Sequence, residues 1–182
     1  MQKSKGFVSA VLLVASLAMV ACASTRTTKS AGEQVDDSVT TGRVKAALIA
    51  DPTTKAHQID VETFKGTVQL NGFVDTAASK SRASEVAKGT KGVTAVRNNL
   101  TVKMDPRTGS QTVNDAAITT KVKAALAGDP RTKAHQVNVE TREGAVQLSG
   151  FVDTSEAKST AEELARAVDN VKSVDNELDV KK

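Results

Sequence analysis

The chain has 182 residues, with 25 lysines and arginines against 21 acidic residues, a formal net charge of +4, and neither Trp nor Tyr. This length allows one or two small domains, whose cores must be mainly aliphatic because the chain has only four Phe. The charges form no long basic run and few aromatic residues lie among them, so a nucleic-acid-binding groove is not predicted.

Residues 1–22 have the layout of a signal peptide. The basic stretch MQKSK precedes an apolar run of 16 residues, GFVSAVLLVASLAMVA, which is shorter than the roughly 20 residues of a membrane-spanning helix. The run ends at Cys22, the only cysteine, and MVAC resembles a bacterial lipobox. Three interpretations stay open: lipidation of Cys22, ordinary cleavage after Ala23, and an uncleaved anchor. Lipidation is favoured because an exported protein with one free thiol risks intermolecular disulfides, and two or three acyl chains make a stable anchor.

The residues after Cys22 bear on the destination of the chain. Ser24 differs from the Asp that typically retains enterobacterial lipoproteins in the inner membrane. By resemblance to that sorting rule, the sequence predicts the outer membrane, in its inner, periplasmic leaflet. Residues 23–35 are rich in Ser, Thr and Ala without apolar periodicity. They are predicted to form a flexible tether that reaches about 20 Å.

The rest of the chain is a tandem duplication. Residues 37–103 align with residues 115–181 at a constant offset of 78, and about 37 of the 67 pairs are identical. The longest shared phrase is VQLNGFVDT at 68–76 and VQLSGFVDT at 146–154. We assign the copies to residues 36–104 and 114–182, joined by a linker over 105–113.

The second copy predicts the order α-β-β-α-β. A first helix is expected from a cap at Asn114 or Asp115 to the stop at 128–130, followed by strands at 136–141 and 145–152. Asp153 is interpreted as the cap of the second helix, with Glu156 as its capping-box partner. The last strand carries Val174, Leu178 and Val180 on one face. The predicted fold class is therefore α+β, a tandem pair of small domains, each with two helices packed on a three-stranded mixed sheet.

Equivalent positions of the two copies predict how their strands pack and which copy is more stable. Gly72 and Gly150 lie within a predicted strand and are interpreted as making room for the packing helix. The second copy is predicted to be the more stable. It has Ile118 where the first copy has Thr40, and it has Ala where the first copy has Gly89, here taken as a helix-interior glycine.

This order of elements, with VKAAL on the first helix, GxVQLxGFVDT and the closing GVTAVRNNLTV, resembles the BON domain. The resemblance covers both copies, nearly all of residues 36–182. Two such domains behind a signal peptide resemble osmotically inducible periplasmic proteins and the lipid-binding lipoproteins associated with division and outer-membrane stress. The resemblance implies periplasmic residence, association with phospholipid or the envelope, and no catalysis.

No catalytic residue, metal site or cofactor site is predicted. His57 and His135 both occur in KAHQ without a nearby Cys, and are interpreted as loop residues at the start of a strand. Asp75 and Asp153 are explained as helix caps, and Lys181 as a solvated side chain. Only a preformed polar pocket near His57 or His135 would favour an enzyme.

The first helix of each copy carries an outward face of small and apolar residues edged by cations. This face follows from 100° per residue when Val44 and Leu48 point to the core. The candidate binding surface comprises Val39, Gly42, Arg43, Lys45, Ala46 and Ile49 in the first copy and Ala117, Thr120, Lys121, Lys123 and Ala124 in the second. The face is either just a helix of small residues or a contact surface for the sister domain, an envelope protein or anionic phospholipid.

Together these features predict a non-enzymatic, lipid-anchored periplasmic protein that supports envelope integrity under osmotic or membrane stress. The leading alternative is a soluble periplasmic stress protein that acts as a chaperone-like or protein-binding module.

Overall fold

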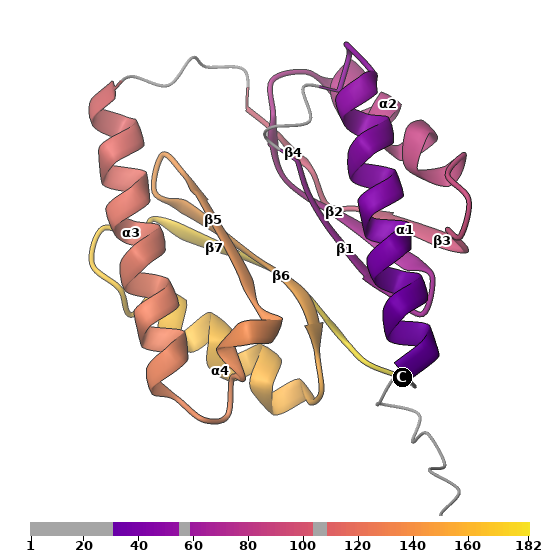
Figure 1. Ribbon diagram of the computed structural model, residues 1–182. Coiled ribbons are helices and arrows are strands. Elements are labelled where there is room, and N and C mark those ends of the chain that lie inside the picture. Colours follow the sequence, from indigo (N-terminus) through magenta and orange to yellow (C-terminus); the bar gives the residue numbers. More distant parts are fainter. Residues whose placement is uncertain (1–30, 55–58, 104–108) are drawn as a thin grey trace, which may run out of the picture.

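The computed structural model describes residues 31–54, 59–103 and 109–182, which form two α-β-β-α-β domains (Figure 1). The first contains α1 (Ala31–Ala50), β1 (Ile59–Phe64), β2 (Thr67–Val74), α2 (Ala77–Lys88), β3 (Ala95–Asn98) and β4 (Thr101–Val102). The second contains α3 (Gly109–Gly128), the short 3-10 helix η2 (Ala134–Gln136), β5 (Asn138–Arg142), β6 (Ala145–Val152), α4 (Ser155–Arg166) and β7 (Ser173–Val180). The predicted α+β class is confirmed. The signal peptide, Cys22 and His57 lie outside the described residues.

Both sheets are mixed and have the same topology. β2 pairs antiparallel with β1 and parallel with β3 and β4, while β6 pairs antiparallel with β5 and parallel with β7. Two-residue turns close the hairpins at Lys65-Gly66 and Glu143-Gly144, with positive φ at both residues of each turn. Such turns match the twist of paired antiparallel strands. The parallel pairs require a crossover, which α2 and α4 supply.

A buried aspartate of the first helix fastens each hairpin turn. The Asp37 carboxylate accepts hydrogen bonds from the backbone N–H groups of Lys65 at 2.8 Å and Gly66 at 2.9 Å. Asp115 does the same with the N–H groups of the second turn, at 2.9 and 3.0 Å. Each aspartate therefore fixes the position of its helix along the sheet.

The first helices are longer than the sequence analysis predicts. α1 begins at Ala31, within the segment assigned to the tether, and α3 begins at Gly109, within the segment assigned to the linker. The prediction that Asn114 or Asp115 caps the helix is wrong, because both lie inside α3. Asp115 has the side chain of a typical cap, but its hydrogen-bond partners lie 28 and 29 residues away in the hairpin.

Threonines, rather than aspartates, cap the second helices. The Thr154 side chain accepts a hydrogen bond from the Ala157 N–H at 3.0 Å, and Thr76 caps α2 in the same way. The predicted cap at Asp153 with Glu156 as its capping-box partner is therefore wrong. Asp153 lies one residue before the cap, and its carboxylate is bound by lysine side chains instead.

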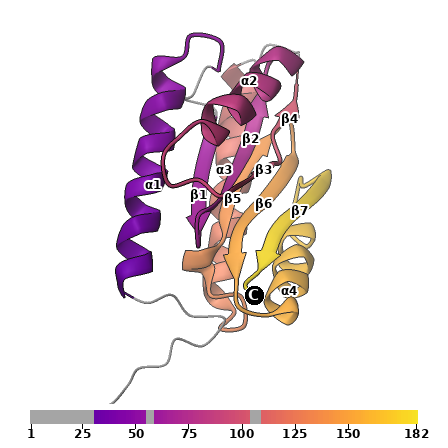
Figure 2. The same cartoon turned by 90° about the vertical axis from the view of Figure 1, so that its right-hand side faces the viewer.

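The helices cover one face of each sheet, and the two sheets face each other between the pairs of helices (Figures 1 and 2). In β2, alternation directs Val68, Leu70 and Val74 into the core beneath α1 and α2. It directs Gln69, Asn71 and Phe73 to the opposite face, where all three are buried. A second aliphatic core lies beneath α3 and α4. The layers are therefore helices, sheet, sheet, helices.

Gly150 has a φ of 124°, a region that favours glycine. A Cβ atom there would collide with the backbone carbonyl oxygen of Gln136. The close neighbour is thus the last residue of the short 3-10 helix η2 and not one of the packing α-helices, so the interpretation that this glycine makes room for the packing helix is wrong. Gly72, at the equivalent position of the first domain, has a φ of 110°.

Candidate functional site

The two copies of VQLxGFVDT form the centre of the domain interface. The Gln69 Oε1 atom accepts a hydrogen bond from the Gly150 N–H at 3.0 Å, and the Gln147 Oε1 atom accepts one from the Gly72 N–H at 2.5 Å. Their Nε2 atoms donate to backbone carbonyls of the opposite domain, at Glu177 and Asn99 respectively. Both glutamine side chains are buried. The duplicated phrase thus contacts itself with approximate two-fold symmetry.

The two ends of this interface differ in chemistry. At one end the rings of Phe64 and Phe151 stack with their centres 5.2 Å apart. The residue equivalent to Phe64 in the second domain is Arg142, which is buried at the other end. Its Nη2 atom donates to the Lys103 carbonyl at 3.0 Å, and its Nη1 atom lies 3.7 Å from the Asp75 carboxylate. One end therefore holds an aromatic pair and the other a buried guanidinium.

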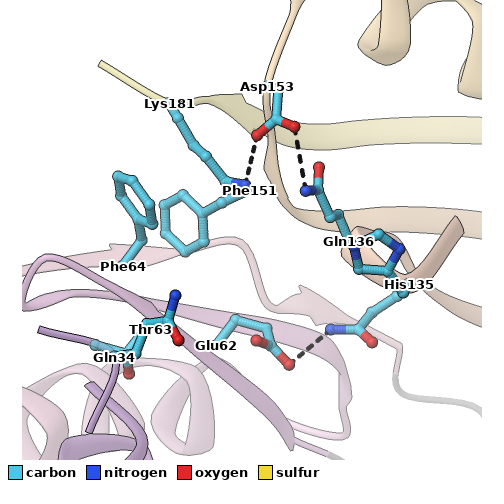
Figure 3. Close-up of a pocket in the computed structure, with 10 residues that line it drawn as sticks. Gln34, Glu62, Thr63, Phe64, His135, Gln136, Phe151, Asp153 and Lys181 are labelled. Carbon is cyan, nitrogen blue, oxygen red and sulfur yellow. Dashed lines mark hydrogen bonds and ion pairs between the residues drawn. The ribbon is translucent and has the colours of Figure 1, made fainter. Parts of the chain in front are cut away.

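A pocket of about 540 Å³ opens beside the aromatic pair, between the two domains (Figure 3). Its polar walls come from both domains, and the Asn138 Nδ2 atom bridges them by donating to Glu62 Oε1 at 2.9 Å. The lining residues are Gln34, Glu62, Thr63, Phe64, His135, Gln136, Asn138, Phe151, Asp153 and Lys181. The volume is within the range of small-molecule sites.

Asp153 is the most strongly bound carboxylate in this pocket. Its two oxygens accept hydrogen bonds from Lys133 Nζ at 2.6 Å, Lys181 Nζ at 2.7 Å and Gln136 Nε2 at 3.3 Å. Burial by itself would raise the pKa of Asp153, but the bonds from Lys133, Lys181 and Gln136 outweigh it and hold the pKa well below the usual range. Asp153 is therefore ionised at neutral pH. Lys181 is largely buried, so the prediction that it is solvated is wrong.

His135 lines this polar pocket. A preformed polar pocket near this histidine is the feature that would favour an enzyme. His135 lies in η2, directly before β5. The Asp153 carboxylate is engaged by lysines and Gln136 and does not orient the imidazole, as a nucleophile-activating site would require. Within the described ranges, no group of three or more His, Cys, Asp or Glu side chains could hold a metal ion. The pocket thus offers hydrogen bonds and charge for binding.

The structure exposes the helix face singled out from the sequence. On α1 the side chains of Val39 and Ile49 are 43% and 74% exposed, and Gly42, Arg43, Lys45 and Ala46 are exposed with them. Val44 and Leu48 lie in the core, as the periodicity predicts. On α3, Ala117, Thr120, Lys121, Lys123 and Ala124 are likewise exposed. Within the described ranges, this face makes no observed contact with the sister domain, because the domains meet through their sheets.

Sequence reasoning missed one further turn of this face. Val35 on α1 and Val113 on α3 are 62% and 69% exposed and lie four residues before Val39 and Ala117. From the sequence alone, both valines fall in the segments that we assign to the tether and the linker. Sequence reasoning also missed Gln69, Gln147, Glu62 and Gln136. One signal pointed to the two glutamines: they are identical in the two copies and lie on the face of their strands opposite the aliphatic residues.

The chain belongs to the BON domain family, whose model matches residues 36–104 and 114–182. It is similar to three proteins in particular. Osmotically-inducible protein Y of Escherichia coli K12 is 43% identical over 152 residues, which cover 82% of this chain and 75% of that protein. The outer membrane lipoprotein DolP of Haemophilus influenzae is 34% identical over 172 residues, 93% and 86% of the two chains. A 21 kDa hemolysin of Actinobacillus pleuropneumoniae is 35% identical over 147 residues, 80% and 75%.

No helix within residues 31–54, 59–103 and 109–182 is long and apolar enough to cross a membrane.

Proposed function

We propose that this chain is a non-catalytic, lipid-anchored periplasmic protein that supports the integrity of the outer membrane under osmotic or membrane stress. Two relatives support this proposal, since one is named for osmotic induction and the other as an outer membrane lipoprotein. The layout of residues 1–22, with Cys22 after the apolar run, supports the anchor. The lipidated Cys22 would hold both domains at the periplasmic leaflet of the outer membrane.

The working surface is the exposed face of the first helices, above all that of α1. The observation that carries this proposal is the exposure of Val35, Val39 and Ile49 along one side of α1. Surface helices normally direct charged residues outward. Burying two such side chains against a partner contributes roughly 2–4 kcal/mol. The equivalent positions of Val39 and Ile49 on α3 are alanines, so the first domain offers the larger apolar area.

The partner is an envelope protein or, as the second candidate, anionic phospholipid. Gly42 and Ala46 lack bulk at the centre of the face and are exposed, so another helix can approach closely. Arg43 and Lys45 flank them and are exposed as well. Near an anionic surface each would contribute about 1 kcal/mol, in a salt-dependent way. The sister domain does not compete for this face, because it is packed against the sheet.

The test replaces two outward residues with acids, as Ala46→Glu and Ile49→Glu together. Both positions face away from the core, so the thermal melt of the variant should be unchanged. The variant should no longer restore the permeability barrier of the envelope in a strain that lacks the protein. The matched control is Ala78→Glu with Ser81→Glu, which adds the same charge to an exposed part of α2. Co-sedimentation with neutral and with anionic vesicles separates the two partners. If the folded double mutant rescues as well as wild type, the face is only a helix of small residues.

The alternative is a soluble periplasmic stress protein with a chaperone-like or protein-binding role. The relative named for osmotic induction supports the stress role in this alternative. The two proposals share the α1 face and differ in the fate of Cys22.

A further inference from the structure

Among the described residues, the pocket between the domains contains one buried acceptor without a donor and one carboxylate without a cation. The Gln136 Oε1 atom is buried and has no hydrogen-bond partner in the part of the chain that the structure describes, while the Nε2 atom of the same side chain donates to Asp153. The Glu62 carboxylate accepts one hydrogen bond from Asn138, and among the described residues no cation lies within ion-pair distance of it. A buried acceptor without a donor is costly, so a ligand that supplies N–H groups is favoured here.

The cations already in this region serve the other carboxylate. Lys133 and Lys181 both donate to Asp153, which leaves the charge of Glu62 uncompensated. Glu62 and Gln136 come from opposite domains and both line the same pocket (Figure 3). A positively charged group with at least two donors would satisfy both side chains.

The opposite end of the interface shows which cation suits this fold. There the chain supplies its own guanidinium, that of Arg142, which binds the Lys103 carbonyl and lies beside Asp75. At the end with the pocket the equivalent residue is Phe64, which carries no charge. The Nζ atoms of Lys65 and Lys181 lie 5.6 and 5.8 Å from the centre of the Phe64 ring, so this ring already has cations beside it.

We propose that the pocket binds a guanidinium group, with the Glu62 carboxylate and Gln136 Oε1 as its acceptors. A guanidinium is planar, permanently charged and carries five N–H donors in a fixed fork, and it stacks on aromatic rings. A volume of about 540 Å³ holds such a group with its aliphatic chain. The group can come from free arginine or from an arginine side chain of an extended peptide. This site is separate from the α1 face and does not depend on its role.

The experiment titrates the purified chain with Nα-acetyl-arginine amide and follows the Gln136 side-chain amide by NMR. Saturable binding is expected, with resonances of Gln136 and Asn138 shifted. Nα-acetyl-citrulline amide has nearly the same shape without the charge, and should bind at least tenfold more weakly. A second titration uses free arginine. If both Nα-acetyl-arginine amide and free arginine bind, the ligand is either a peptide or a small molecule. If free arginine alone binds, the ligand is the small molecule.

Three variants locate the site. Glu62→Gln keeps the acceptor for Asn138 and removes the charge, and Gln136→Met removes the unpartnered oxygen; each should weaken binding at least fivefold. Glu140→Gln, the same change at the equivalent and exposed position of the second domain, should leave affinity unchanged. Thermal melts establish that each variant is folded. Absence of binding, equal binding of citrulline, or equal loss in Glu140→Gln would each overturn the proposal.

Discussion

Gln69 and Gln147, equivalent residues of the two copies, each bind the backbone N–H of the glycine three residues beyond the other. The exchange is possible because each copy presents the same strand face to its sister. A duplicated domain can therefore bind its sister copy when the same face of one strand carries both a hydrogen-bond donor and a hydrogen-bond acceptor in register. The interface joins two small cores into one larger folded unit.

Replacing Gln69 with leucine should lower the free energy of unfolding by about 1–3 kcal/mol, because the Gly150 N–H would stay buried without a partner. Chemical denaturation of the whole chain measures this change. Gln34→Leu, at an exposed position, serves as the control and should have little effect. An unchanged midpoint in Gln69→Leu would show that this contact contributes nothing to stability.

When the domains are separated as residues 31–104 and 109–182, the second should melt at the higher temperature. Thr40 and Ile118 occupy equivalent buried positions, and only the isoleucine is fully apolar. Gly89 is the C-cap of α2 and not an interior residue, so the expected penalty of a helix-interior glycine does not arise.

The same comparison predicts that Thr40→Ile raises the melting temperature of the first domain. Differential scanning calorimetry of the two fragments and of this variant tests the ranking. A first domain that melts above the second would contradict it.

Stability should fall as the pH drops below about 4, partly through Asp153. Lysine and Gln136 hydrogen bonds hold the folded-state pKa of Asp153 below its usual value near 3.9, so the folded state favours the ionised form. The contribution of Asp153 to the free energy of unfolding is complete above its pKa in the unfolded state. It is lost as the pH falls through its pKa in the folded state. Asp153→Asn should therefore be most destabilising at pH 7 and progressively less so as the pH falls from 4 to 2. Urea denaturation at pH 7 and at pH 2 measures this, with the exposed Asp175→Asn as control. If Asp153→Asn lowers the free energy of unfolding by the same amount at both pH values, Asp153 does not have this role.

Local patterns predicted the helices, the strands and the exposed face of α1, because the 3.6-residue and two-residue periods follow directly from which side chains meet the core. They failed where a side chain binds something distant. Asp115 and Asp153 have the local appearance of helix caps, but their partners lie in a hairpin turn and on Lys133 and Lys181. The Gln147 side chain binds a glycine 75 residues away in the other domain.

The sequence also predicted the first helices to be shorter than they are at their N-terminal ends. Val35 and Val113 belong to the exposed face, but polar residues surround them and no apolar period marks the first turns of α1 and α3.

The proposal that the chain is a lipid-anchored envelope protein is tested most directly by the intact mass and membrane fractionation of the mature protein. We expect a membrane-bound form that begins at Cys22 and carries the mass of a diacylglyceryl group. Cys22→Ser should give an unprocessed precursor or a soluble periplasmic form in place of the membrane-bound one. A soluble wild-type protein cleaved after Ala23, identical in fractionation to Cys22→Ser, would contradict the anchor and leave the soluble stress protein as the function.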